Sequence, residues 1–212
     1  MPIDTFLFDL DGTLLDSMAD IAMGVNLVRA ELDLPPLPQS TVRAYVGDGS
    51  PLLVRRSLPE GLYSEERLQR FLTLYGEHML EQSRIYPGIR EFLELHRGKR
   101  MAVVTNKHHA LTVRLLEEFG ISSFFQAVIG GDSASEKKPH PGPVLAALKT
   151  LEAKAASAVL IGDHHTDLRA GRTAGVRTCF CAWGIGEAGG VPSDFLAETP
   201  FDLPRLFPGE AR

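Results

Sequence analysis

The length, composition and charge of this chain limit the classes of protein to which it can belong. It has 212 residues, 44% of them hydrophobic and 23% charged, which suits one α/β domain or such a domain with a small insert. The formal net charge of -5 argues against a protein that coats nucleic acid or an anionic membrane. No apolar run approaches the roughly 20 residues of a transmembrane helix. No signal peptide is visible, so we expect a cytoplasmic protein.

The first elements in chain order are a short strand and a long helical segment. Residues 5–9 form a brief apolar run, which predicts a buried strand. Ser17 with Asp20 then resembles a capping box at the start of a helix. Apolar residues at helical spacing continue through residues 15–82, and no strand candidate occurs among them. We therefore expect residues 15–83 to form a helical insert.

From Tyr86 onward, predicted strands alternate with predicted helices. This alternation implies a parallel sheet with right-handed crossovers. The sequence thus predicts an α/β core built from residues 1–14 and 84–212. The later strands of this core are expected at residues 101–104, 127–129, 158–161 and 176–181.

Polar clusters follow four of these segments. Asp9-Leu10-Asp11-Gly12-Thr13 ends the first strand, and Thr105-Asn106-Lys107 ends the next. Lys137-Lys138 and Gly162-Asp163-His164-His165-Thr166-Asp167 follow two further strands. Because ligands bind outside the carboxyl ends of parallel strands, we expect these clusters to converge at one edge of the sheet.

The chemistry of the expected cluster favours phosphoryl transfer. Several carboxylates beside a lysine suit a hard cation, and Mg²⁺ prefers carboxylates, water and substrate phosphate as ligands. The Thr105 hydroxyl, the Lys138 ammonium and loop N–H groups would hold the remaining phosphoryl oxygens. A carboxylate can also act as the nucleophile and form an aspartyl-phosphate.

Taken together, the four clusters resemble the motifs of the haloacid dehalogenase superfamily. Asp9 to Leu14, Thr105, Lys138-Pro139 and Gly162-Asp163 with Asp167 occur in the family's order and at similar intervals. The resemblance implies a Rossmann-like parallel sheet core with a small helical cap domain inserted after the first strand. Within the superfamily the chain looks most like the phosphoglycolate phosphatase branch. The supporting stretches are residues 42–49, 86–88, 104–107 and 129–132.

The resemblance also implies a role for each matching position. Asp9 would be the nucleophile, and Asp11 would protonate the leaving alkoxide and then deprotonate the attacking water. Mg²⁺ would be held by Asp9, by Asp163 and by the backbone carbonyl of Asp11. Asp167 would mainly contact these ligands rather than the ion. The phosphoryl group and the leaving group would be bound by Gly12, Gly47, Asp48, Thr105, Asn106 and Lys138. His164 departs from the family, which usually has a small hydroxyl residue there.

Other patterns in the chain have simpler interpretations. The glycines at 184, 186 and 189 match a dinucleotide-binding motif, but Gly190 and Pro192 interrupt any following helix. The histidine pairs at 108–109 and 164–165 lack a matching Cys/His cluster, so we expect no zinc site. Cys179 and Cys181 lie in an apolar run and are expected to be buried strand residues.

Three basic residues near the expected site have open roles. Lys107 is a rival phosphate ligand but is expected to be solvent-exposed. Arg43 and Arg55 flank the Gly47-Asp48-Gly49 turn, where they would either meet a substrate carboxylate or simply be exposed on helices.

The resulting hypothesis is a Mg²⁺-dependent phosphatase whose substrate is 2-phosphoglycolate. Another phosphatase substrate, such as a sugar phosphate or pyrophosphate, remains open. So does a phosphosugar mutase similar to β-phosphoglucomutase, or a binding protein that kept the fold without catalysis. We expect a small phosphate ester as the partner, neither nucleic acid nor membrane, and a monomer or homodimer.

Overall fold

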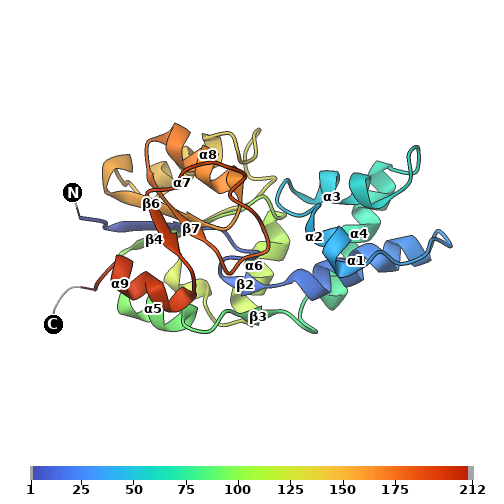
Figure 1. The fold of residues 1–212 in the computed structure, drawn as a ribbon, viewed down its shortest axis with the longest axis horizontal. Helices are drawn as coiled ribbons and strands as arrows, with labels where there is room; N and C mark the ends of the chain where they lie inside the picture. The colour runs from blue at the N-terminus through green and yellow to red at the C-terminus, as the bar shows by residue number, and fades with distance from the viewer. Residues whose placement is uncertain (1, 210–212) are drawn as a thin grey trace.

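A sheet of six parallel strands forms the centre of the protein, whose residues 2–209 are described by this computed structural model (Figure 1). The strands lie side by side in the order β5-β4-β1-β6-β7-β8. The predicted α/β class with a Rossmann-like parallel sheet is therefore confirmed, although β8 was not predicted. In chain order they are β1 (Thr5–Phe8), β4 (Arg100–Val104), β5 (Ala127–Ile129), β6 (Ala158–Gly162), β7 (Arg177–Cys181) and β8 (Phe195–Ala197).

Strand β1 lies in the middle of this sheet, between β4 and β6. Successive side chains of a strand point to opposite faces, so Phe6 and Phe8 enter one apolar core while Leu7 enters the other. All four residues of β1 are buried. A strand covered on both faces has no solvent-facing position, which explains why its sequence is a continuous apolar run.

Helices cover both faces of the sheet. The face that receives Phe6 is covered by α5 (Ile89–Leu95), α6 (His109–Glu118) and α9 (Leu203–Leu206). The face that receives Leu7 is covered by α7 (Gly142–Thr150) and α8 (His165–Ala174). Short 3₁₀ turns lie at Ser122–Phe124, Ala155–Ser157 and Pro200–Asp202.

Four further helices form a separate lobe beside the carboxyl edge of the sheet, drawn in blue to teal in Figure 1. They are α1 (Met18–Ala30), α2 (Gln39–Arg43), α3 (Ser50–Ser57) and α4 (Glu65–His78), and we call them the helical lobe. Helices α1 and α4 pack closely, because a Cβ at Gly24 would lie 3.0 Å from Cβ of Tyr75. Ile21 and Val25 of α1 share this apolar core with Phe71 of α4.

A two-stranded antiparallel ribbon connects the helical lobe to the rest of the chain. Leu15 and Asp16 of β2 (Leu15–Asp16) pair with Ile85 and Arg84 of β3 (Arg84–Ile85). The expectation of no strand within residues 15–82 was therefore wrong at its first two residues. A strand of two residues has no periodicity of its own, and only pairing with a distant partner defines it.

The predicted capping box at the start of α1 was also wrong. The Ser17 hydroxyl makes no capping bond; it donates to Oδ1 of Asp11 at 2.6 Å. The buried Asp20 carboxylate accepts the backbone N–H groups of Gln82 and Ser83. Both side chains therefore make contacts outside their own helix, which a local pattern of two residues cannot reveal.

Strand β7 contains both cysteines of the chain. Cys179 and Cys181 are both buried in β7 with free thiols, as predicted. Burial raises the pKa of the Cys181 thiol well above its ordinary value, so the thiol stays protonated. Among the helices described for residues 2–209, none is long and apolar enough to cross a membrane.

Candidate active site

A buried lysine joins two of the predicted aspartates beyond the ends of β1 and β6. The Lys138 ammonium lies 3.0 Å from Oδ1 of Asp9 and 2.5 Å from Oδ1 of Asp167, and it also donates to the Val104 carbonyl at 2.6 Å. Lys138 and Asp167 are fully buried, whereas 13% of the Asp9 side chain is exposed. Three segments far apart in the sequence are thus brought together, because β1 lies beside both β4 and β6.

Asp163, which follows β6, is held by a loop that sequence reasoning missed. Its Oδ2 accepts the backbone N–H groups of Ile185 and Gly186 at 2.8 Å each, and its Oδ1 accepts the Thr13 hydroxyl at 3.2 Å. Gly12 has a φ of +83°, and a Cβ there would overlap Oδ2 of Asp163. The Gly12 position therefore needs glycine both for its turn and for this close approach.

Three of these carboxylates are arranged to share one cation. Asp9, Asp163 and Asp167 each offer an oxygen, and these oxygens lie within 4.8 Å of one another. Burial, reinforced by the two neighbouring aspartates, raises the pKa of Asp163 to about 8. Burial also raises the pKa of Asp9 to about 6, against the opposing effect of Lys138. The Lys138 ammonium therefore does not balance the negative charge of the three carboxylates.

This donor set fits a hard divalent cation. All of its ligand atoms are carboxylate oxygens, which Mg²⁺ prefers. Oδ1 of Asp9 is buried and faces the Lys138 ammonium at 3.0 Å, and this one contact leaves lone pairs on the oxygen for a metal. Asp167 is more heavily engaged, because its Oδ1 faces Lys138 and its Oδ2 accepts the backbone N–H of His164. Asp9 and Asp163 are therefore the better candidates for direct ligands.

The predicted phosphate-binding residues lie beside this cluster at the end of β4. The buried Thr105 lines the same pocket as Asp9, and its hydroxyl oxygen accepts the backbone N–H of Lys107. The Asn106 amide instead makes a bridge: it donates at 2.8 Å to the carbonyls of both Gly47 and Lys138. Asn106 therefore connects the helical lobe to the segment that carries Lys138.

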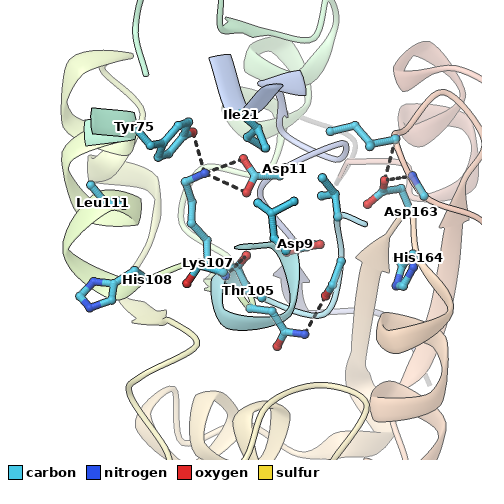
Figure 2. Close-up of a pocket in the computed structure, with 18 of the residues that line it drawn as sticks. Asp9, Asp11, Ile21, Tyr75, Thr105, Lys107, His108, Leu111, Asp163 and His164 are labelled. Carbon is cyan, nitrogen blue, oxygen red and sulfur yellow. Dashed lines mark hydrogen bonds and ion pairs between the residues drawn. The ribbon is translucent and has the colours of Figure 1, made fainter. Parts of the chain in front are cut away.

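Asp11, the second carboxylate of the first cluster, is held between the lobe and the core. Both of its oxygens lie 3.0 Å from the Lys107 ammonium, which also donates to the Tyr75 hydroxyl at 2.7 Å (Figure 2). Ser17 donates a third hydrogen bond to Asp11. The expectation that Lys107 is solvent-exposed was wrong, because only 8% of its side chain is accessible. Helix α4, which carries Tyr75, covers it.

A pocket with about 670 Å³ of empty space opens between the sheet edge and the helical lobe. The core contributes polar groups to its wall, among them Asp9, Asp11, Thr105 and Asp163. The lobe contributes mainly apolar side chains to the opposite wall, namely Ile21, Val46, Leu53, Phe71 and Leu72. Such a concave site with convergent polar groups is typical of small-molecule binding.

The lobe segment that follows α2 reaches this pocket only in part. Gly47 and Gly49 line the pocket. Asp48 does not line it, and its carboxylate pairs with Arg56 at 2.6 Å; its contact with a substrate stays a prediction. Neither Arg43 nor Arg55 lines the pocket. Arg43 donates to the carbonyls of residues 184 and 185, and Arg55 lies over the Tyr63 ring.

The unusual His164 packs against the lobe without joining a metal cluster. A Cβ at Gly47, where φ is +117°, would lie 2.7 Å from the His164 ring. His164 also caps α8, and burial, with a contribution from His165, lowers its pKa to about 4. Among the described residues, the candidate metal cluster consists of Asp9, Asp163 and Asp167. The neutral ring of His164 is therefore a packing surface at the pocket.

The sequence did not predict the residues that hold Asp163, His164 and Lys107 in place. The glycines at 184 and 186 matched a dinucleotide motif, yet they allow the chain to approach Asp163 and His164 closely. Their clustering was the one available signal for this loop. Tyr75 lies in the stretch that was expected to be helical, and nothing local indicated that its hydroxyl would reach Lys107.

The fold and the site together consist of an α/β core with an acidic pocket at the carboxyl edge of its sheet. A family model for haloacid dehalogenase-like hydrolases matches residues 6–181. The chain belongs to this family and is a phosphatase of it, in agreement with the resemblance of its motifs.

Individual relatives and solved structures agree with this assignment. The phosphoglycolate phosphatase of Pseudomonas syringae pv. tomato is 36% identical over 213 residues, which cover 96% of this chain and 78% of that protein. The phosphoglycolate phosphatase of Aquifex aeolicus is 36% identical over 202 residues, which cover 94% of each chain. A predicted phosphoglycolate phosphatase from Haemophilus somnus 129PT has a similar structure, with a TM-score of 0.89 and 28% identity over 96% of this chain and 97% of that one.

Proposed function

We propose that this protein is a Mg²⁺-dependent phosphomonoesterase that converts 2-phosphoglycolate to glycolate and phosphate through an aspartyl-phosphate. The observation that carries this proposal is the convergence of Asp9, Lys138 and Asp163 at one sheet edge, beside a pocket between the sheet and the helical lobe. The named activity of the relatives supports the choice of substrate.

Asp9 and Asp11 divide the chemistry between them. A carboxylate oxygen of Asp9 attacks phosphorus, and the bond to the leaving oxygen breaks while Asp11 gives that oxygen a proton. Asp11 then takes a proton from water, whose oxygen attacks phosphorus and releases Asp9. Asp9 suits the nucleophilic role because its pKa of about 6 leaves it ionised near neutral pH.

The surrounding groups bind and neutralise the transferring phosphoryl group. The Thr105 hydroxyl and the Lys138 ammonium would contact its oxygens, and Lys138 also orients Asp9. Mg²⁺ would be held by Asp9, Asp163 and the Asp11 backbone carbonyl, with Asp167 behind them, and it supplies compensating positive charge. Gly12 allows Asp163 to approach, and Asn106 fixes the Lys138 segment against the lobe.

The helical lobe acts as a cap in this proposal. Residues 15–83 would form the cap domain, and residues 1–14 and 84–212 would form the catalytic core. Gly47, Arg43 and Tyr75 of the lobe all hydrogen-bond to core residues around the pocket. A cap in this position excludes water from the reaction and selects the leaving group.

A screen of phosphate esters with Mg²⁺, scored by kcat/KM, tests the proposal. The expected result is a preference for 2-phosphoglycolate over sugar phosphates and pyrophosphate, with inorganic phosphate as the product. Isomerisation of a hexose 1-phosphate without phosphate release would instead identify a mutase. We further propose that the enzyme acts on this small ester in the cytoplasm, as a monomer or homodimer.

A further inference from the structure

Lys107, a cation in the wall of the pocket, is the starting point for a further inference. Among the described residues that line the pocket, Lys107 is the single lysine or arginine. It lies at the sheet edge two residues after Thr105, opposite an apolar lobe wall that includes Ile21 and Phe71. Lys138 is already surrounded by Asp9, Asp167 and a carbonyl. Lys107 is therefore the lysine or arginine of the pocket wall that is placed to meet a negative charge on the leaving group.

The environment of Lys107 keeps it charged and directed at the pocket. Burial alone would lower its pKa, but Asp11 and Tyr75 outweigh burial and raise the pKa above the ordinary value. The Tyr75 hydroxyl accepts one N–H at 2.7 Å, and the Tyr75 ring centroid lies 4.3 Å from the ammonium. These contacts fix the end of a side chain that would otherwise be flexible.

The Lys107 ammonium makes one more hydrogen bond to Asp11 than the ion pair between the two groups requires. The ammonium is 3.0 Å from both Asp11 oxygens, although a single N–H would suffice to pair the two groups. Oδ1 of Asp11 retains the Ser17 hydroxyl at 2.6 Å when this second N–H is withdrawn. One donor of Lys107 can thus turn to a second anion without leaving Asp11 unpaired.

We propose that Lys107, anchored by Tyr75 of the lobe, recognises a carboxylate or other anionic group on the leaving alcohol and so determines substrate specificity. Asp9 and Asp11 are two residues apart, so their backbones are separated by at most about 7 Å. A two-carbon leaving group attached to a phosphoryl group at Asp9 can span that interval. The inference rests on the proposed function and deepens it, because it names the residue that distinguishes acidic esters from neutral ones.

A pair of substrates that differ in the presence of the carboxylate tests this role. Ethyl phosphate replaces the carboxylate of 2-phosphoglycolate with a methyl group, so the ratio of the two kcat/KM values measures recognition of the anion. In Lys107→Met we expect this ratio to fall about 10-fold to 100-fold, the value of one hydrogen bond to a charged group. The loss should lie mainly in KM for 2-phosphoglycolate. Lys107→Arg should restore part of the ratio, because it keeps the charge.

If Lys107→Met also disturbs Asp11, hydrolysis of both esters slows to the same extent. This effect therefore cancels in the ratio of the two kcat/KM values. Lys137→Met is the matched control: Lys137 neighbours the site but does not line the pocket, so the ratio should stay within about twofold of wild type. Tyr75→Phe should lower the ratio less than Lys107→Met does. An unchanged ratio in Lys107→Met, or an equal fall in Lys137→Met, would overturn the assignment.

The same experiment separates this inference from the proposed function. If the wild type hydrolyses neutral esters best, the enzyme is still a phosphatase and the role of Lys107 is wrong. If the wild type prefers a different acidic ester, the ratio is measured with that ester and its neutral analogue. If no phosphate ester is hydrolysed, the proposed function fails and the inference fails with it.

Discussion

The Lys138 ammonium and the Asp167 carboxylate form an ion pair of 2.5 Å in which both side chains are fully buried. Removing one partner leaves the other charge uncompensated, so we expect Lys138→Met to lower the free energy of unfolding by about 3–5 kcal/mol. The double variant Lys138→Met/Asp167→Asn should recover part of that stability but no activity. Urea unfolding of the single and double variants provides the measurement. Fully additive losses would show that the two charges are not coupled.

The nucleophile can be tested separately from folding. Asp9→Asn should lower kcat by at least about 10³-fold, because an amide cannot form the aspartyl-phosphate. Its free energy of unfolding at pH 7 should not decrease, since the substitution removes a buried charge whose pKa is raised to about 6. Phosphate release and urea unfolding are measured on the same preparation. Turnover at a substantial fraction of the wild-type rate would refute this assignment.

Metal dependence should appear in both activity and stability. Chelation should abolish phosphate release, and added Mg²⁺ should restore it and raise Tm by preferential binding to the folded state. Asp163→Asn should remove most of the Mg²⁺-dependent rise in Tm, a readout that does not require turnover. Activity that survives exhaustive chelation would argue against the proposed cofactor.

The pKa of Asp163 also predicts how stability depends on pH in metal-free buffer. The folded protein holds this proton up to a pKa of about 8, whereas the unfolded chain releases it near the ordinary value of 3.8. Between these values the folded state binds more protons, so Asp163 makes stability fall as pH rises from about 4 to 8. In Asp163→Asn the decline should be shallower. Equal slopes for variant and wild type in urea titrations would contradict the expected shift.

The contact between Gly47 and His164 predicts coupled effects on catalysis. Gly47→Ala places a Cβ 2.7 Å from the His164 ring at a φ of +117°, so we expect a loss of roughly 1–3 kcal/mol of stability and a lower kcat/KM. His164→Ser should relieve the clash but not the backbone strain. The double variant should therefore recover only part of the loss. Gly61→Ala is the control, because its Cβ would meet nothing within 4 Å and only strain remains.

The sequence was most informative where a signal was local and chemical. The apolar run before Asp9 and the alternating pattern after Tyr86 predicted the parallel sheet. A parallel sheet then predicted the convergence of Asp9, Lys138 and Asp163, because the ends of its strands meet at one edge. These inferences needed only residue types, spacing and a general rule of topology.

The remaining features depend on contacts between distant segments. The Ser17 hydroxyl had two possible partners, its own helix or Asp11, and tertiary structure selected Asp11. The exposure of Lys107 depended on whether Tyr75 of the lobe would cover it. Strand β8 was missed because its three residues follow no predicted helix, and it is defined by pairing with β7.

The β2–β3 ribbon is a site at which the helical lobe could be replaced by a different insert. The chain leaves and re-enters the core through the paired residues Leu15 and Ile85, whose backbones are one strand spacing apart, about 5 Å. A different insert needs only two adjacent ends to be grafted there, and the register of β1 with β4 and β6 would not change. A transplanted insert would bring its own pocket wall, while the acids and lysine at the sheet edge remain. In the proposed function, such an exchange would change the accepted phosphate ester and leave the groups that cleave its phosphate bond in place.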